Sequence, residues 1–417
     1  MIKRTTNRNA RLAAFATSAL SVILMASCSQ GTKPSQSDTI TSDTSTVADT
    51  LRVYNFSDNA PFDTLRYNNL IESVKFIPLE TVDDALLDDG QLFAHKIGDR
   101  YVVTSRAYEL RVKVFDENGK FLKNGFICGR GHYEIPITYS SAVDEYRGVV
   151  IINGFNKVLI FNVNTLETDV FFPNLQEEHN IFEIYPLGAN TYAGLDIPHD
   201  TPETDKANYP YMFLLDSSFN IVDALRYESD GERKSVLPPP NIDIEFSMLN
   251  ERWGLSQTQN GLLFRQIYND TIFFINQDFR QEPAFVINRG KDRIPTFAER
   301  KQSYKKPFDK MCFDYVLESQ DYIFLSYRNG DEKSAIWHKS SSQMILQSND
   351  GFSRNFCVPA SFDGFSGIIE VKQIAHGNTI ISAIPAGKLL NVLPGLKEDD
   401  NPVVVEIKLK DYYNLEQ

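Results

Sequence analysis

Cysteines are few in this sequence and long hydrophobic runs are missing from most of it, and each absence excludes a class of protein. Only 4 of 417 residues are cysteine, which excludes a disulfide-dense scaffold. After residue 28 no apolar run approaches the roughly 18 residues of a membrane-spanning helix. Basic residues number 42 against 55 acidic ones, and no stretch is dense in lysine and arginine. Such an acidic chain is not expected to bind nucleic acid.

Catalytic signatures are also missing. The sequence holds no His-Glu-x-x-His, Gly-x-Ser-x-Gly, Gly-x-x-x-x-Gly-Lys-Ser/Thr or Cys-x-x-Cys motif. Its histidines are scattered, and scattered histidines are more often isolated residues than metal ligands, although repeated β folds can gather them around an axis. We therefore predict no catalytic residue, metal site or cofactor, and enzymatic activity stays an open question. The six histidines are His95, His132, His179, His199, His338 and His376.

The N-terminus has the composition of a bacterial lipoprotein signal peptide. Four basic residues and no acidic residue precede residues 12–27, which are apolar or small throughout. Ala26-Ser27-Cys28 resembles the bacterial lipobox, with Met25 in the place where that motif prefers leucine. The resemblance implies that Cys28 is lipidated on sulfur and becomes the mature N-terminus. The alternative is a plain secretory peptide that is cleaved nearby.

Residues 29–50 predict a flexible tether. They are mostly Ser, Thr, Asp, Gln and Gly, with no apolar periodicity before Val47. As a coil they would reach roughly 25 Å. We therefore predict three parts: a signal peptide over residues 1–27, the lipidated cysteine with its tether over residues 28–50, and one folded domain over residues 51–417.

The folded part repeats one short pattern. An alternating apolar strand ends in Asp or Asn, polar turn residues follow, and a second apolar strand returns. The Asp or Asn falls at positions 116, 162, 216 and 276, so the repeat is about 50 residues long. Each copy follows another apolar strand. The first strands of these copies are residues 111–116, 157–162, 211–216 and 271–276, with a degenerate fifth copy at 334–338.

This spacing predicts an all-β fold, a six-bladed β-propeller with four-stranded antiparallel blades. The last strand, residues 403–409, has no return partner after it. We predict that residues 74–79 from the N-terminal side supply its outer neighbour, which closes the ring and removes exposed sheet edges. A pair of β-sandwiches is the alternative, because sandwiches also contain short alternating strands.

Several short sequence segments resemble those of a known family. Residues 114–121, Val-Phe-Asp-Glu-Asn-Gly-Lys-Phe, and residues 129–134, Gly-Arg-Gly-His-Tyr-Glu, are similar to the phrase of NHL-type propellers and, more closely, to bacterial six-bladed β-propeller lipoproteins. Further matching phrases stand at 76–81, 269–273 and 401–405. The resemblance covers residues 51–417. His132-Tyr133 replace the Pro-Gly pair of the family's glycine-rich loop.

The glycine-rich loop is the first candidate binding site. In an NHL-like blade this segment would cross the propeller face near the axis, where Gly129 and Gly131 would allow positive φ and close backbone passage. Two interpretations are open. The loop could line a ligand pocket, or Glu134 could make it a structural latch by pairing with Arg130 or by capping backbone amides. The residues that would form the pocket are Arg130, His132, Tyr133 and Glu134.

Three long insertions form a second candidate site. They span residues 196–209, 229–253 and 288–310, and the last two are rich in lysine and arginine on an otherwise acidic chain. Arg252 and Trp253 would contribute to a cationic, aromatic rim that suits an anionic glycan, a peptide carboxylate or an acidic partner surface. Solvated loops without a ligand are the alternative.

Two function classes therefore remain open. The first is a binding or scaffold protein, anchored by lipid to the cell envelope at the outer membrane, which presents a propeller face to a glycan, peptide or envelope protein. The second is a propeller enzyme, a lyase or hydrolase acting on sugars or peptides. Three cysteines besides Cys28 are expected to be small buried hydrophobes. They are Cys128, Cys312 and Cys357.

Overall fold

The computed structural model describes most of the predicted propeller domain. It describes residues 51–411 apart from 58–59, 89, 107–108, 174, 176–180, 197–209, 227–252, 267–268, 294–310, 350–354, 373 and 375–376. Residues 50–417 form one compact unit. The predicted signal peptide, Cys28 and the tether lie outside the described residues. No helix in the described part is long and apolar enough to cross a membrane.

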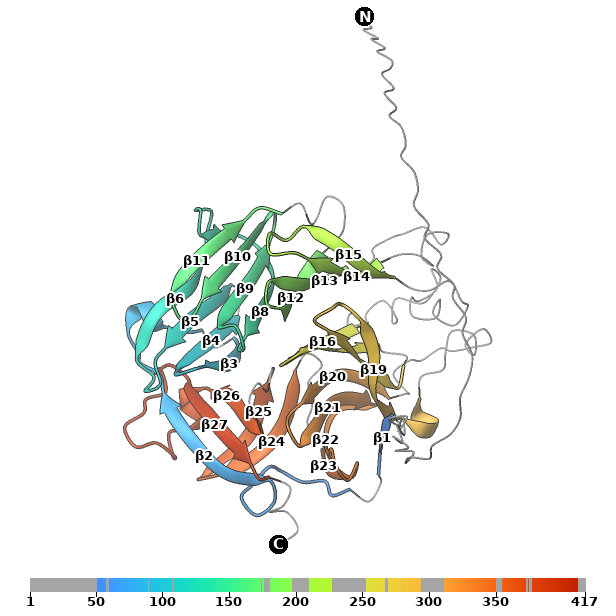
Figure 1. Ribbon diagram of the computed structural model, residues 1–417. Helices are drawn as coiled ribbons and strands as arrows, with labels where there is room; N and C mark the ends of the chain where they lie inside the picture. Colours follow the sequence, from blue (N-terminus) through green and yellow to red (C-terminus); the bar gives the residue numbers. More distant parts are fainter. Residues whose placement is uncertain are drawn as a thin grey trace, which may run out of the picture. The chain divides into compact units, whose positions relative to one another are not determined.

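Six antiparallel blades form a ring, as the repeat predicts (Figure 1). In five blades the four strands follow one another in chain order, with the first strand innermost and the fourth farthest from the axis. The first three blades, from the inside outwards, are β3 (Gln91–Ile97), β4 (Arg100–Arg106), β5 (Leu110–Phe115) and β6 (Phe121–Cys128); β8 (Thr138–Asp144), β9 (Val149–Gly154), β10 (Lys157–Asn162) and β11 (Glu167–Phe171); β12 (Ile181–Gly188), β13 (Thr191–Asp196), β14 (Pro210–Leu215) and β15 (Ile221–Arg226). The fourth and fifth are β16 (Trp253–Thr258), β17 (Gly261–Gln266), β18 (Thr271–Asn276) and β19 (Gln281–Asn288); β20 (Cys312–Glu318), β21 (Tyr322–Asn329), β22 (Asp331–His338) and β23 (Met344–Ser348).

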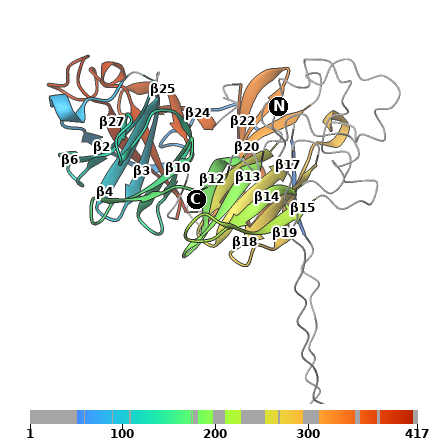
Figure 2. The same cartoon turned by 90° about the horizontal axis from the view of Figure 1, so that it is seen from above.

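The sixth blade joins the two ends of the domain. Strand β27 (Val403–Leu409) pairs with β26 (Thr379–Ile384) on one side and with β2 (Ile71–Pro78) on the other. Strands β2 and β27 lie side by side in both views (Figures 1 and 2). The predicted closure is therefore confirmed. The blade is completed by the hairpin of β24 (Phe356–Phe362) and β25 (Phe365–Val371), which forms a separate two-stranded sheet.

Apolar residues on both faces of a strand hold neighbouring blades together. In β9, Val150 and Ile152 belong to the cluster shared with the first blade, whereas Ile151 belongs to the cluster shared with the third. The closing strand β2 behaves in the same way, since Phe76 packs into the cluster of the sixth blade and Ile77 into that of the first. Burial on both faces explains why these strands read as nearly continuous apolar runs in the sequence.

An N-terminal strap, which the sequence did not reveal, runs along the outer edges of the fourth, fifth and sixth blades. Its first strand, β1 (Arg52–Asn55), pairs in parallel with β19. Trp337 in the fifth blade donates its indole N–H to the carbonyl of Asn55 at 2.9 Å. The amide of Leu65 donates to the carbonyl of Pro359 in the sixth blade at 2.9 Å. The strap, residues 51–70, thus joins three blades before β2 begins.

The Asp or Asn of the repeat closes the turn between the third and fourth strands. The carboxylate of Asp116 accepts hydrogen bonds from the backbone N–H groups of Asn118 and Lys120, both at 2.9 Å. Asp216 and Asn276 accept equivalent bonds in the third and fourth blades. Short polar side chains that bind backbone two residues on favour such turns, so the repeated residue type has a local cause.

Gly119 follows Asp116 by three residues and has a positive φ of 81°. Positive φ alone does not require glycine, because Phe219 and Phe279 hold the same place in other blades with φ of 65° and 61°. A Cβ at Gly119, however, would lie 2.1 Å from the carbonyl oxygen of Pro78. Glycine is needed there because the ring-closing strand passes directly over this turn.

Gly119→Ala should therefore destabilise the domain much more than Gly98→Ala. Gly98 also has a positive φ, but a Cβ placed on it would have no atom within 4 Å. We expect Gly98→Ala to cost about 1 kcal/mol, from the left-handed backbone alone. Gly119→Ala should cost about 2 kcal/mol more, because the backbone of β2 must move. Denaturant unfolding measures both losses, and equal losses would contradict the close approach.

Candidate functional site

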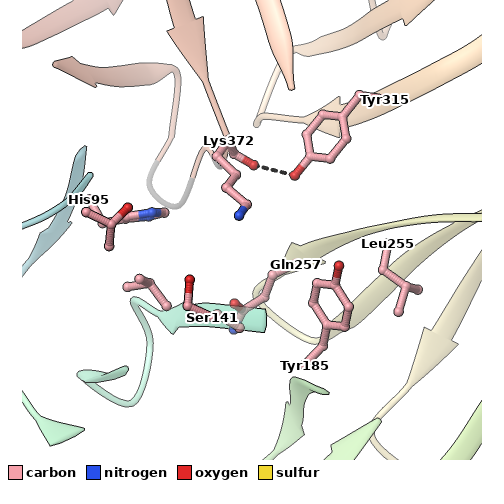
Figure 3. A pocket seen from close by; sticks show the side chains of 10 residues that line it. His95, Ser141, Tyr185, Leu255, Gln257, Tyr315 and Lys372 are labelled. Atoms are coloured by element: carbon pink, nitrogen blue, oxygen red, sulfur yellow. Dashed lines mark hydrogen bonds between the residues drawn. The ribbon is translucent and has the colours of Figure 1, made fainter. Parts of the chain in front are cut away.

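A cavity lies on the axis of the ring, and side chains from all six blades line it. It has a volume of about 30 Å³, which is enough for roughly two water molecules. Pockets that enclose whole ligands have volumes of roughly 300–1,000 Å³. The cavity therefore fits one functional group of a ligand. Its lining residues are His95, Thr104, Ser141, Ala142, Val143, Tyr185, Leu255, Gln257, Tyr315 and Lys372 (Figure 3).

Lys372 provides the one full positive charge among the lining residues. It follows β25 directly, and its side chain points into the cavity (Figure 3). The hydroxyl of Tyr315 donates to the carbonyl oxygen of Lys372 at 2.6 Å and fixes the backbone at this point. The ammonium lies 5.1 Å from the ring centre of Phe93, and within the described part of the chain it makes no hydrogen bond or ion pair.

The surroundings of Lys372 lower its pKa. Burial is the main cause, since the surrounding protein separates the ammonium from bulk water. The carboxylate of Glu183 acts against this effect, and the guanidinium of Arg106 adds to it. The ammonium is therefore less well solvated than one in bulk water and is able to gain from a bound anion.

Carboxylates behind the cavity wall orient the other polar groups. Glu145 bonds Nδ1 of His95 at 2.9 Å, with both side chains buried, which leaves Nε2 for a ligand. The hydroxyl of Tyr185 donates to Glu183 at 2.8 Å. The amide nitrogen of Gln257 donates to Asp144 at 3.0 Å, so Gln257 is held with a defined orientation. The cavity thus presents hydrogen-bonding groups that are positioned before a ligand arrives.

The sequence did not identify this site as a whole. Of the described histidines, only His95 lines the cavity. A usable signal exists, because the innermost strand of each of the first five blades carries a residue with a polar side-chain group at the level of the cavity. These residues are His95 in β3, Ser141 in β8, Tyr185 in β12, Gln257 in β16 and Tyr315 in β20.

The glycine-rich loop does not cross the face near the axis, so that expectation is wrong. It connects β6, the outermost long strand of the first blade, to the short strand β7 (Glu134–Ile135), which pairs in parallel with β6. The His132 ring lies 6.2 Å from the ring of Phe172, just after β11. The loop therefore lies beside the outer strands of the first two blades, because the chain adds a strand there before it turns inwards.

The loop contains the latch that the alternative interpretation expected. The carboxylate of Glu134 accepts a hydrogen bond from the amide of Gly131 at 2.7 Å. Neither Gly129 nor Gly131 is among the glycines with positive φ. Both lie against the Glu134 carboxylate instead, which is only 2.0 Å from a Cβ placed on Gly129. Of the two roles expected for these glycines, the structure shows close approach and does not show positive φ.

The remaining predicted site residues are only partly described. Arg252 lies outside the described residues, and Trp253 begins β16 but its side chain is outside the description. Cys312 and Cys357 are buried as expected, and Cys128 is half-buried. Burial raises the pKa of the Cys357 thiol. The described residues contain no group of three or more His, Cys, Asp or Glu that would hold a metal ion.

Comparisons with known proteins identify a family, and one solved structure supports the fold. A family model described as "Domain of unknown function (DUF4934)" matches residues 50–408. A crystal structure of a Bacteroides fragilis protein described as exported is 13% identical, with a TM-score of 0.59, over 87% of this chain and 100% of that one. A Bacteroides vulgatus member of the DUF4221 family is 10% identical, with a TM-score of 0.49, over 83% and 99%. A search of curated proteins found no match.

Proposed function

We propose that this chain, which belongs to the DUF4934 family, is a lipid-anchored binding protein of the cell envelope whose axial cavity receives one group of its ligand. The location is supported by the lipobox-like Ala26-Ser27-Cys28 and by structural similarity to a protein described as exported. The ring provides a rigid frame, because its last blade is closed by strands from both ends of the domain.

The observation that carries this proposal is the position of Lys372. Its ammonium points into a cavity that all six blades line, and it makes no ion pair among the described residues. An anion that reaches it would gain a charge-assisted hydrogen bond. His95 and Gln257, held from behind by carboxylates, would offer further hydrogen bonds.

The size of the cavity restricts what can enter. Room for about two water molecules admits a carboxylate but not a whole sugar or amino acid. The rest of the ligand would lie outside, on the propeller face. This arrangement suits an acidic sugar of a glycan, a peptide carboxylate or an acidic side chain of an envelope protein.

A second candidate function is supported by the lowered pKa of Lys372. An amine that loses its proton more readily than an ordinary lysine can act as a general base. Tyr185 and Tyr315, which share the cavity, carry hydroxyl groups that transfer protons in many enzymes. A lyase or hydrolase acting on sugars or peptides would use these groups.

Glucuronate and glucose form a matched pair of probes that tests the binding proposal. We expect the protein to bind glucuronate more tightly than glucose, because only glucuronate carries a carboxylate. Lys372→Met should weaken glucuronate binding about 10- to 100-fold. This change in affinity corresponds to the loss of a charge-assisted hydrogen bond, which contributes about 1.5–3 kcal/mol. Lys388→Met, which removes an exposed lysine at the end of the short 3-10 helix Ala386–Lys388, is the control. Calorimetric titration measures the affinities.

The pH dependence provides a second readout. Glucuronate binding needs the ammonium form of Lys372, so affinity should fall as the pH rises through the lowered pKa of this residue. Lys372→Arg should retain binding at high pH, because arginine stays charged. Equal affinity for glucuronate and glucose, or unchanged affinity in Lys372→Met, would contradict the proposed site.

A further inference from the structure

Large hydrophobic side chains are exposed together on the first two blades, at one end of the strands of the second blade. Seven such side chains in the described part of the chain are more than half exposed, and five of them belong to this region. We call these five the rim patch. They are Ile127 (54%), Tyr133 (59%), Ile137 (61%), Phe155 (58%) and Phe172 (65%).

Contacts connect the parts of the rim patch. The His132 ring lies 4.7 Å from the ring of Tyr133 and 6.2 Å from that of Phe172. Ile127 pairs with Glu134, the neighbour of Tyr133, in the β6–β7 ladder. The carbonyl oxygen of Ile137 lies 2.7 Å from a Cβ placed on Gly154, which precedes Phe155.

The backbone under the rim patch is held firmly. Nζ of Lys157, in β10, donates to the carbonyl oxygens of Gly131, His132 and Glu134 at 2.9, 3.2 and 2.8 Å. The same ammonium lies 5.7 Å from the ring centre of Phe172. The apolar side chains are thus presented by an ordered loop. Little conformational entropy remains to be lost when a partner covers them.

We propose that the rim patch docks on the surface of a lipid bilayer. Aromatic and aliphatic side chains with a neighbouring cation, here Arg130, are typical of surfaces that enter the headgroup region. A glycan would need hydrogen-bonding groups, but Lys157 and Glu134 already bond within the loop. The surface that remains is mainly apolar, which fits acyl chains.

The predicted tether also favours a lipid bilayer as the partner of the rim patch. Residues 29–50 separate the domain from Cys28, and an extended chain of this length reaches about 75 Å at most. A tethered domain stays at a high effective concentration near the bilayer, so weak apolar contacts are enough to orient it. This step rests on the proposed lipid anchor, whereas the affinity of the patch for lipid does not.

Vesicle flotation tests the proposal on the chain that begins at Ser29, which cannot be lipidated at Cys28. Vesicles of phosphatidylcholine and phosphatidylethanolamine should carry this protein upwards. Phe155→Ser combined with Phe172→Ser should reduce the partition coefficient at least 10-fold. Phe62→Ser combined with Val222→Ser is the matched control, because these residues are equally exposed but lie elsewhere, at 59% and 57%. All variants should melt at similar temperatures.

Three results would overturn the proposal. They are no flotation of the unsubstituted chain, equal flotation of the two double variants, and a dimer that the rim substitutions disrupt while vesicles stay unbound. Glucuronate binding gives an independent readout, since it should persist in the rim variant. Failure of the rim patch is therefore distinguishable from failure of the axial site or of the anchor.

Discussion

A mature chain that lacks residues 29–80 should fail to fold, whereas one that lacks residues 29–50 should melt like the intact mature chain. The long deletion removes β2, and with it the outer neighbour of β27 along seven paired positions from Ile71–Leu409 to Pro78–Val403. It also exposes the apolar clusters that Phe76 and Ile77 cover. An open propeller edge invites aggregation. The short deletion removes no described contact.

An intermediate deletion separates the strap from the closing strand. A chain that lacks residues 29–70 keeps β2 but loses β1 and the hydrogen bonds at Asn55 and Leu65. Tyr54, which is 1% exposed and contacts Phe285 edge-on at 5.4 Å, is lost as well. We expect this chain to fold with a clearly lower melting temperature.

Circular dichroism during heating measures all three chains, and size-exclusion chromatography separates folded from aggregated protein. A cooperative transition in the chain that lacks residues 29–80 would show that ring closure is dispensable. A melting temperature unchanged by loss of residues 29–70 would show that the strap adds no stability. In that second case the hydrogen bonds at Asn55 and Leu65 would not contribute to the stability of the domain.

The blades could be predicted because their signals are local. Asp116, Asp216 and Asn276 each close a turn with their own side chain and following backbone. The flanking strands alternate or run continuously apolar within six residues. Ring closure by residues 74–79 could also be predicted, since residues 403–409 needed a partner. In both cases a few adjacent residues carry the information.

The axial site could not be predicted because it depends on residues far apart in the chain. His95 and Lys372 are 277 positions apart, yet both line one cavity of the ring. Whether a polar residue of an inner strand faces the axis depends on the register of each blade, and bulges shift that register. In β8, for example, the pairing slips between Thr138 and Ser140. The predicted position of the glycine-rich loop near the axis was wrong for a similar reason. The short strand β7, which pairs with β6, could not be predicted from the sequence.

Cys28→Ser should move nearly all of the protein from the membrane fraction to the soluble envelope fraction. The variant is produced behind a plain secretory signal peptide in place of residues 1–27, so that an uncleaved lipoprotein signal cannot itself hold it in the membrane. Among the described residues no helix can span a bilayer, and the lipid on Cys28 would be the strong attachment. Stable anchoring needs more than one acyl chain. Loss of incorporated fatty acid should accompany the release.

Cys128→Ser, produced behind the chain's own residues 1–27, is the matched control for this experiment. Cys128 is a half-buried thiol near the carbonyl of Pro136 and offers no lipobox-like context, so the control should stay lipidated and bound to membranes.

The rim patch is expected to hold the Cys28→Ser variant only weakly, because its apolar contacts are reversible and are lost on dilution. Adding Phe155→Ser and Phe172→Ser removes this contribution. If the combined variant still sedimented with membranes after dilution, the chain would have to be held there by something other than Cys28 and the rim patch, and the lipoprotein assignment would be wrong.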